Sequence, residues 1–540
     1  MAEKGEMAMA LDFNKALKKM EYEESRGNNP IPDILGFSYI KGVFGRDFSS
    51  KLEDILTNYI NRTIVPKPLL KIDVPKSNFT IRPMARPETK DWLIYEAIID
   101  YLSKKILKSG QICERSFSVL SFKECNAKGA GPWLEFNKKA RDLYEEGYKH
   151  VVVTDLTGYY ENINLGELRK RIIDYLNGDT GSKDFTTVLF RLLEKWSDTR
   201  IPGHGLPQGP PASAFLADIF LDHVDRKMEK YGHYFRYMDD IRIFCKKEID
   251  AKLALKGFTI ALRDLNLNIN AKKTDILCGK EIGKKLFNPK KSILDLIVGI
   301  MKSGDKKLIE EHVVPALIKL VEDAFAGGPF EGTHLNFALP MLSNLHNSDF
   351  VFDTDGVIKL IESNFVSKPH HAGLFLNFLS MFPEKENIVK SLILFLRSEN
   401  NIYEWQELRI LQTLLKFNVG INRREIDFFM ESAKDSNKHY AVRAFYFLLV
   451  GKFGNNRDRG VIVDFYSHLS EPESYTKIAV ILAVQELVSC SDFYSQIKRS
   501  GGDDDICRFV DYVKSLKKPL YYLERPKPKI ETFEEVEQPY

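Results

Sequence analysis

The spacing of apolar residues changes period twice along this chain. A helix is expected around Phe13 to Met20, and a second over residues 49–62, because apolar side chains recur there every three to four positions. Two short strands are then predicted over 70–74 and 78–82, followed by an amphipathic helix over 92–106. The chain therefore begins with a helical segment and continues into mixed helix and strand.

A run of four β-branched residues, 151–154, indicates a strand that is buried on both faces. Asp155 stands where this strand ends. An acid in such a place is costly unless it is paired or binds a metal ion, so Asp155 is a candidate functional residue. Tyr160 follows five residues later, and it either lies beside a ligand held by Asp155 or is a core tyrosine.

Residues 234–245 predict a β-hairpin with Asp239 and Asp240 at its turn. Like charges held together on a rigid turn need a cation. Mg²⁺ prefers carboxylate oxygens and keeps the rest of its shell for water and phosphates, which suits nucleotidyl transfer. On its own, however, an Asp-Asp pair is more typical of a solvated turn.

Two further stretches carry candidate chemistry. The loop 201–211 is rich in Gly and Pro and feeds an apolar helix that begins near Ala212, although no Gly-Lys-Ser/Thr follows as in a Walker loop. Residues 262–277 predict a helix end and then a strand near Lys272 and Lys273, which are also typical of a solvated strand edge.

Lys76 and Arg82 lie on the first predicted hairpin, and they are either a pair of ligand-binding cations or solvated side chains.

From about residue 286 to 513 the pattern is helical throughout. Amphipathic helices are expected over residues 293–300, 308–325, 388–396, 405–417, 440–453 and 475–487. Tyr403, Tyr440 and Tyr475 begin three similar segments, 37 and then 35 residues apart. This period predicts stacked helix pairs of an α-solenoid related to the HEAT type.

The boundaries of these patterns predict four regions. They are an N-terminal helical segment at 1–70, a mixed domain at 71–285, a helical repeat domain at 286–513, and a flexible charged tail at 514–540.

Composition adds little to this picture. Of the 540 residues 44% are hydrophobic and 28% are charged, as in an ordinary globular protein, and the net charge of +3 neither demands nor excludes nucleic acid. Six scattered cysteines have no zinc-binding spacing. With no signal peptide or membrane-length apolar run, we expect a soluble cytoplasmic protein with reduced thiols.

In chain order, the informative stretches are D-L-T-G-Y-Y from Asp155, L-P-Q-G-P-P-A-S with Gln208, Y-M-D-D ending at Asp240, and L-N-I-N-A-K-K-T with Lys273. Together they resemble the four motifs of the reverse-transcriptase palm, over roughly residues 70–285. The resemblance implies an α+β right-hand polymerase fold with fingers and palm, here followed by the α-helical HEAT-like repeat domain.

The same resemblance implies a catalytic site of Asp155, Asp239 and Asp240. These acids, with Leu156 beside them, would bind two Mg²⁺ ions, with Mn²⁺ as an alternative. The second acid of the Y-M-D-D motif often supports the site without ligating in this family, so Asp240 is the least settled ligand.

Five more residues match family positions that bind the incoming dNTP. Tyr160 matches the steric gate, which would favour deoxynucleotides, and Gln208 matches a residue that contacts the nucleotide or template near the sugar. Lys76 and Arg82 match cations of the fingers that hold the triphosphate. Lys273 matches a candidate proton donor to pyrophosphate.

Two departures from the family pattern are visible. Trp92 stands where an arginine usually follows aspartate after the fingers hairpin, which leaves one expected cation unassigned. After Lys273 the typical compact three-helix thumb is not evident.

A Y-x-D-D palm followed by helical repeats resembles the bacterial abortive-infection and defence-associated reverse transcriptases, particularly the AbiK type. This resemblance implies antiphage function in the bacterial cytoplasm and homo-oligomers of three or six subunits. It also implies a DNA product that is either untemplated or directed by a companion non-coding RNA.

Priming from a protein tyrosine is a further implication of the resemblance. A priming tyrosine must reach the metal ions, so it is expected on a flexible segment. Candidates in the C-terminal tail are Tyr521, Tyr522 and Tyr540, and candidates near the N-terminus are Tyr22 and Tyr39.

Two alternatives remain open at this point. One is a catalytically idle palm that serves as an oligomeric RNA-binding or phage-sensing scaffold. The other is a retron-type templated reverse transcriptase, which would carry a thumb that binds a specific RNA.

Overall fold

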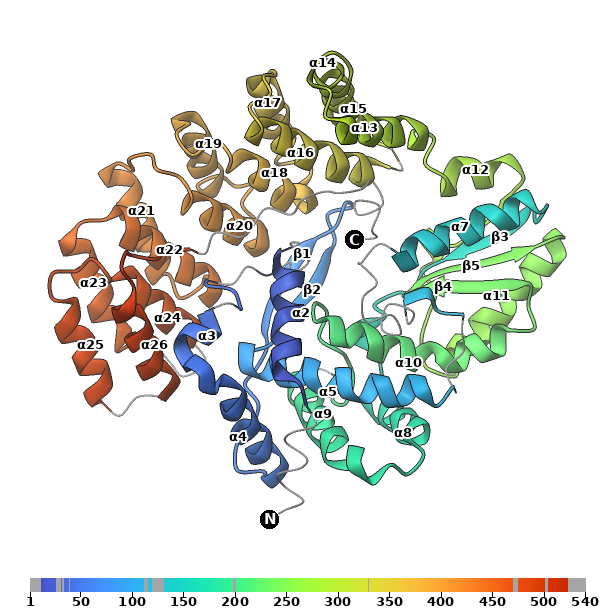
Figure 1. Cartoon of the computed structure of the whole chain (residues 1–540), viewed down its shortest axis with the longest axis horizontal. Helices are drawn as coiled ribbons and strands as arrows, with labels where there is room; N and C mark the ends of the chain where they lie inside the picture. Colours follow the sequence, from blue (N-terminus) through green and yellow to red (C-terminus); the bar gives the residue numbers. More distant parts are fainter. Residues whose placement is uncertain are drawn as a thin grey trace.

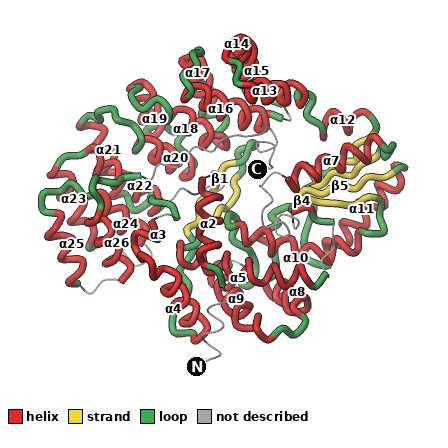
Figure 2. The backbone as a smooth tube through the Cα atoms, viewed as in Figure 1, coloured by secondary structure: helices red, strands yellow, loops and turns green. Residues whose placement is uncertain are grey.

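A computed structural model describes the protein over residues 11–25, 31, 34–37, 39–110, 115–118, 131–197, 201–328, 330–469, 474–500 and 504–522. Its helices form a broad arch (Figure 1). A small sheet lies at one end of the arch, and a two-stranded hairpin lies near the centre. Helix dominates the described residues, and strands are confined to these two places (Figure 2).

The central hairpin consists of β1 (Leu70–Pro75) and β2 (Ile81–Arg86), which pair antiparallel. The sequence predicts the second strand over 78–82, so this expectation is corrected. The Asn78 side chain accepts hydrogen bonds from the backbone and hydroxyl of Thr80 at 3.3 and 2.6 Å, and Phe79 has a φ of 63°. These contacts lengthen the turn and delay the start of β2.

Behind the hairpin, helices pack into an apolar core around the long α5 (Thr89–Lys108), whose Glu88 cap accepts from the Lys90 N–H. Its helical neighbours include α2 (Phe13–Ser25), α4 (Phe48–Asn61), α8 (Leu165–Leu176), α9 (Lys183–Trp196) and α10 (Pro211–Met228). The predicted helices at 13–20, 49–62 and 92–106 are therefore present with shifted ends.

The four-stranded sheet has the order β4 (His233–Tyr237), β5 (Asp240–Cys245), β3 (His150–Thr154) and β6 (Asp275–Cys278), and all neighbours are antiparallel. Helices α10 and α11 (Glu248–Arg263) cover one face, where Val152, Ile241 and Ile243 are buried. Helix α7 (Gly131–Glu145) packs on the other face. Burial on both faces explains why β3 is continuously β-branched.

The rest of the arch is helical. Its helices are α12 (Lys280–Leu286), α13 (Lys291–Ser303), α14 (Lys306–Leu308), α15 (Val314–Phe325), α16 (Glu331–Asn347), α17 (Thr354–Asn364), α18 (Ala372–Leu379), α19 (Glu386–Leu396), α20 (Glu404–Leu414), α21 (Arg423–Lys434), α22 (Tyr440–Phe453), α23 (Asn456–Tyr466), α24 (Ser474–Ala483), α25 (Cys490–Arg499) and α26 (Asp504–Ser515). The helix predicted over 308–325 contains a π-helical turn, η5 (Ile309–Val313).

The helical region and the hairpin share one apolar core. Leu70 and Ile72 of β1 are buried in the same cluster as the helices from α13 to α26. At the far end of the arch, Phe509 of α26 lies 6.1 Å from the ring of Tyr39, in the short helix α3 (Tyr39–Phe44). No helix among the described residues combines the length and apolar character needed to cross a membrane.

Candidate polymerase active site

Asp155 follows directly after β3, in the middle of the sheet. Its side chain is 17% exposed, and one carboxylate oxygen accepts the Leu156 N–H at 2.8 Å. The Asp155 carbonyl accepts the Asn270 N–H at 2.7 Å, and Leu156 forms an isolated bridge with Ile269. Backbone bonds on both sides therefore fix where the carboxylate of Asp155 stands.

Asp239 and Asp240 lie at the tight turn between β4 and β5, as the sequence predicts. Tyr237 pairs with Asp240 across the turn, and Met238 has a φ of 54°. Thr154 of β3 pairs with Ile241 of β5, so Asp155 and Asp240 follow at adjoining ends of neighbouring strands. The register of the sheet thus brings together acids that are far apart in sequence.

The charges of this cluster are poorly hydrated and repel one another. Burial, and then the neighbouring Asp155, raise the pKa of Asp239 to about 7. Burial also raises the pKa of Asp240, an effect that Arg242 opposes and Asp155 increases. Three crowded carboxylates are the donor set that hard divalent cations prefer, so Asp155, Asp239 and Asp240 fit a magnesium site.

The side chain of Lys273 provides a cation at this site. Its ammonium lies 2.5 Å from an Asp155 carboxylate oxygen, although the lysine side chain is 64% exposed. Lys273 ends the short 3₁₀ turn η4 (Ala271–Lys273), just ahead of β6. The lysine predicted from sequence therefore contacts the acid cluster directly.

Lys76 of the hairpin lies within electrostatic reach of the same cluster. Its backbone N–H, at the β1–β2 turn, donates to the Thr80 carbonyl at 2.7 Å. Burial lowers the pKa of Lys76, and nearby Arg82 and Lys273 lower it further, while Glu161 and Asp155 oppose them. Lys76 therefore lies near Asp155, and Arg82 lies near Lys76.

Tyr160 lies beside the acids as well. Burial raises the pKa of its hydroxyl well above the ordinary value, and the charge of Asp239 adds to this shift. Its carbonyl accepts the Leu206 N–H at 2.9 Å, and its ring lies 5.7 Å from that of Tyr159. The ring is thereby tied to the loop that precedes α10.

Gln208 connects that loop to the hairpin. Its carbonyl accepts the Ala85 N–H of β2 at 2.8 Å. The next residue, Gly209, has a φ of 142°, and a Cβ there would lie 2.7 Å from the Ala85 carbonyl oxygen. Glycine is required at 209 because the hairpin and the loop approach so closely.

A buried arginine, which sequence reasoning did not select, supports the acid turn. Arg236 of β4 is 1% exposed, and it donates from Nε and Nη2 to Asp225 at 2.8 and 2.7 Å. It also donates from Nη1 to Asp218 and to the Met238 carbonyl. Ser118 accepts the Met238 N–H at 3.1 Å. Asp218 and Asp225 stand seven residues apart on the apolar helix α10. Two acids on one face of an apolar helix were the sequence signal that could have revealed this network.

Residues 74–303 match the family model described as reverse transcriptase (RNA-dependent DNA polymerase). The chain contains a reverse transcriptase domain. All the acids described above, together with Gln208, lie within the matched residues.

Two examples show what this chain is similar to. Protein YkfC of Escherichia coli (strain K12) is 24% identical over 176 residues, which are 31% of this chain and 42% of that protein, so the chain spans less than half of this relative. Among solved structures, telomerase from Candida albicans in complex with the TWJ fragment of telomeric RNA aligns with a TM-score of 0.34 and 12% identity, over 63% of this chain and 67% of that chain.

Helix α7 covers one face of the four-stranded sheet, next to the acid cluster. Trp133 lies 5.2 Å from the ring of Tyr237, and the guanidinium of Arg242 lies 4.1 Å from the centre of the Phe136 ring. Among the described residues Nε and Nη1 of Arg242 have no hydrogen-bond partner. Arg242 thus faces Asp240 as a buried cation that sequence reasoning also missed.

The candidate priming tyrosines lie in very different surroundings. Tyr22 on α2 is 45% exposed. Burial raises the pKa of Tyr237 to about 12, with further contributions from Asp218 and from Glu23 of α2. Tyr39 instead faces α26.

The C-terminal candidates are placed differently. Tyr521 is buried, and its hydroxyl donates to the Gly451 carbonyl at 3.1 Å and to Glu486. Tyr522 is half-buried, with the Lys452 ammonium 5.7 Å from its ring. Residues 516–522 thus pack against the helices, whereas the sequence predicts a flexible tail from 514. Tyr540 lies outside the described residues.

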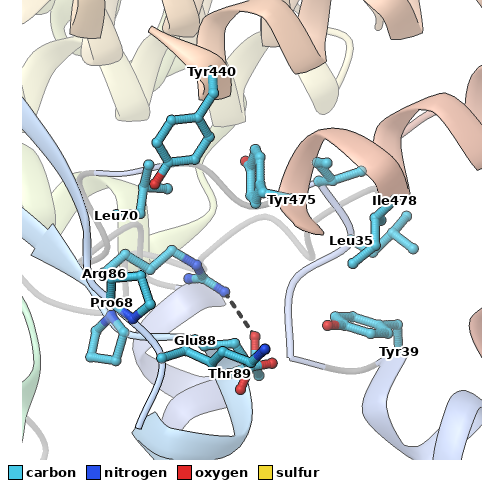
Figure 3. A pocket seen from close by; sticks show the side chains of 13 residues that line it. Leu35, Tyr39, Pro68, Leu70, Arg86, Glu88, Thr89, Tyr440, Tyr475 and Ile478 are labelled. Atoms are coloured by element: carbon cyan, nitrogen blue, oxygen red, sulfur yellow. Dashed lines mark hydrogen bonds between the residues drawn. The ribbon is translucent and has the colours of Figure 1, made fainter. Parts of the chain in front are cut away.

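A separate cavity of about 110 Å³ lies where β2, α5, the N-terminal segment and helices α22 and α24 meet. Arg86, Tyr39, Tyr440 and Tyr475 surround it (Figure 3). The Arg86 guanidinium also lies 5.2 Å from the Trp92 ring. Trp92, the departure from the family pattern, therefore packs against an arginine that precedes it in the chain.

Proposed function

We propose that this protein is an RNA-directed DNA polymerase that adds deoxynucleotides to a 3′ end. The observation that carries the proposal is the convergence of Asp155 and Asp239, whose proximity helps to raise the pKa of Asp239 to about 7. A carboxylate pair of this kind gains stability when a divalent cation binds it. The match of residues 74–303 to reverse transcriptases supports the same reaction.

Asp155, Asp239 and Asp240 would hold the two Mg²⁺ ions, with Leu156 beside them and Mn²⁺ as an alternative metal. When bound, such ions lower the pKa of the attacking hydroxyl and neutralise the triphosphate. Asp240 has the smaller share in this role, because Arg242 compensates part of its charge.

The chain's own residues then position the substrate. Lys76 and Arg82 bind triphosphate oxygens from the hairpin side. The 3′ oxygen forms a bond to the α-phosphorus, and the bond from that phosphorus to the pyrophosphate oxygen breaks. Lys273 lies beside Asp155 and gives its proton to the departing pyrophosphate.

Sugar and base contacts follow from the loop ahead of α10. Tyr160 presents a bulky side chain next to Asp239, where a 2′-hydroxyl would collide with it, so dNTPs are preferred. Gln208 contacts the nucleotide or template near the sugar, because its backbone bond to Ala85 holds it between hairpin and sheet.

At a finer level we propose a bacterial, cytoplasmic enzyme of antiphage defence, similar to the AbiK type. Its helical region from α13 to α26 would be a HEAT-like repeat domain. The enzyme would form homo-oligomers of three or six subunits. It would make an untemplated DNA or copy a companion non-coding RNA.

For protein priming we propose Tyr22 as the best-placed candidate. It is exposed, and it lies on α2, whose Glu23 acts on Tyr237 beside the acid turn. Mass spectrometry of the protein after incubation with dNTPs should find nucleotides on Tyr22 and none in Tyr22→Phe. Nucleotides that persist in Tyr22→Phe would assign priming to another residue, and none in either protein would exclude protein priming.

The polymerase proposal is tested by incorporation of labelled dNTPs with Mg²⁺ or Mn²⁺. Asp155→Asn and Asp239→Asn should each abolish incorporation. Asp264→Asn is the matched control, since that exposed residue caps the C-terminal end of α11 and its carboxylate pairs with Lys227 of α10. No metal-dependent incorporation by the natural protein, with any RNA or DNA or with none, would favour the idle scaffold.

Sequencing of nucleic acid that copurifies with the protein separates templated from untemplated synthesis. A defined companion RNA copied over a fixed stretch would favour RNA-directed synthesis, which the proposed enzyme and the retron-type alternative share. DNA without a matching template would favour untemplated synthesis.

A further inference from the structure

Two histidines and a glutamate converge within the helical region, far from the polymerase acids in sequence. Glu331 is the first residue of α16, and His370 and His371 end the 3₁₀ turn η6 (Pro369–His371). The Nε2 atoms of the histidines lie 3.8 and 3.3 Å from the same oxygen, Oε1 of Glu331. The donor atoms of all three side chains lie within 4.8 Å of one another.

We propose that Glu331, His370 and His371 form a zinc site. Zinc bonds of about 2.0–2.1 Å to nitrogen and oxygen place neighbouring ligands of a tetrahedral ion roughly 3.3–3.4 Å apart. The two nitrogen-to-oxygen distances, 3.3 and 3.8 Å, need only small side-chain movements to reach this spacing. Two imidazoles and one carboxylate leave a fourth position for water or an added ligand.

The fold holds the three side chains in place before any ion binds. The imidazoles of His370 and His371 are packed with ring centres 4.0 Å apart, and His371 also lies 5.8 Å from the ring of Phe375. Each of the three side chains is less than a fifth exposed. Side chains so confined lose little further freedom when they bind a metal ion.

Lys368 is the competing cation. Its ammonium lies 2.8 Å from Oε2 of Glu331, the oxygen that does not face the histidines. A divalent ion at Oε1 would therefore bind against the repulsion of this ammonium. Removal of the lysine charge should strengthen zinc binding, whereas loss of either histidine should weaken it.

The location indicates what the ion would stabilise. Turn η6 contacts β1, the strand of the hairpin that leads to Lys76. An ion that joins η6 to α16 would fix the turn against which β1 rests. We therefore assign the site a structural role at the contact between the helical region and the hairpin.

The test uses the full-length chain, purified without a histidine tag and stripped of metal by a chelator. Zinc binding is measured by calorimetry, and Co²⁺ is used as a spectroscopic probe, because a tetrahedral nitrogen and oxygen site gives a strong visible band. The double variant His370→Gln/His371→Gln should lose one zinc site or bind it at least about 100-fold more weakly. It should also lose the cobalt band.

Three further variants test whether a change in zinc binding comes from the proposed ligands. Glu331→Gln should weaken binding as the histidine changes do, and His312→Gln, an exposed histidine on η5, should bind zinc as the natural protein does. Lys368→Met should bind zinc several-fold more tightly, an effect that misfolding cannot produce. Equal zinc stoichiometry and affinity in the natural protein and the double histidine variant would overturn the proposal.

Discussion

The ammonium of Lys273 and the carboxylate of Asp155 lie 2.5 Å apart, at the end of strand β3 in the four-stranded sheet. Lys273 thereby supplies part of the positive charge that the crowded acids require. A metal ion at Asp155 would weaken this ion pair and leave the lysine able to turn toward pyrophosphate. The same side chain would then serve the site in two successive states.

Replacement of Lys273 by methionine should separate these two roles. The variant should bind Mg²⁺ more tightly, because a competing cation is removed, while its turnover falls by about 10²-fold for lack of a proton donor. Pre-steady-state incorporation at varied Mg²⁺ measures both quantities. Lys272→Met is the matched control, since Lys272 is an exposed lysine next to Lys273 in the chain, and this change should alter neither quantity.

The raised pKa of Asp239 predicts how metal-free stability depends on pH. Between about pH 4 and pH 7 the folded protein keeps a proton on Asp239 that the unfolded chain has lost. This group therefore makes the folded state less stable as pH rises through that window. In a chelator, Asp239→Asn should be more stable than the natural protein at pH 8 by up to roughly 4 kcal/mol, and equal to it near pH 4.

Thermal unfolding at the two pH values checks this expectation. Asp275→Asn is a suitable control, because the Lys285 hydrogen bond lowers the pKa of that exposed carboxyl instead of raising it. The control should gain no stability at pH 8. If Asp239→Asn and Asp275→Asn changed the stability at pH 8 equally, the surroundings of Asp239 would not raise its pKa.

Tyr160 should set the choice of sugar. Tyr160→Ala removes the bulk beside Asp239, so the preference for dNTPs over rNTPs should fall by about 10–100-fold, mainly through better use of rNTPs. Tyr160→Phe keeps the ring and should keep the preference. Competition assays with matched dNTP and rNTP pairs give the ratio directly, and an unchanged ratio in Tyr160→Ala would remove this role.

Arg236 should be required for the fold of the acid turn. Arg236→Met leaves Asp218 and Asp225 buried without their partner, which should cost about 3–5 kcal/mol of stability. Arg263→Met, at the end of α11, is the control and should change stability little. Chemical denaturation of the three proteins compares them, and a loss in the Arg236 variant no larger than in the control would contradict the assigned network.

Much of the polymerase site was predictable because its signals are local. The β-branched run before Asp155 predicts a buried strand, and the apolar residues around Asp239 predict a hairpin, so the pair follows once both are placed in one sheet. The order of the four motifs, which resembles that of the reverse-transcriptase palm, then indicated that the strand and the hairpin belong to one sheet. Lys273 was selected by its match to the fourth motif, and it forms an ion pair with Asp155.

What sequence did not reveal depends on tertiary partners. In the sequence Arg236 is an ordinary residue of a predicted strand. The packing of α10 brings Asp218 and Asp225 into ion pairs with it. The start of β2 was misplaced because the Asn78 side chain binds Thr80 and lengthens the turn. Glu331 meets the two histidines only because α16 and η6 pack together.

The burial of Leu70 and Ile72 among the helices from α13 to α26 has a consequence for how this protein can be divided. A shortened chain that ended near residue 286 would retain every catalytic acid but would expose the apolar face of β1. A strand exposed in that way would invite aggregation and would leave Lys76 without a fixed position. The helical region is therefore integral to the fold that carries the acid cluster, and the two could not be exchanged as independent modules.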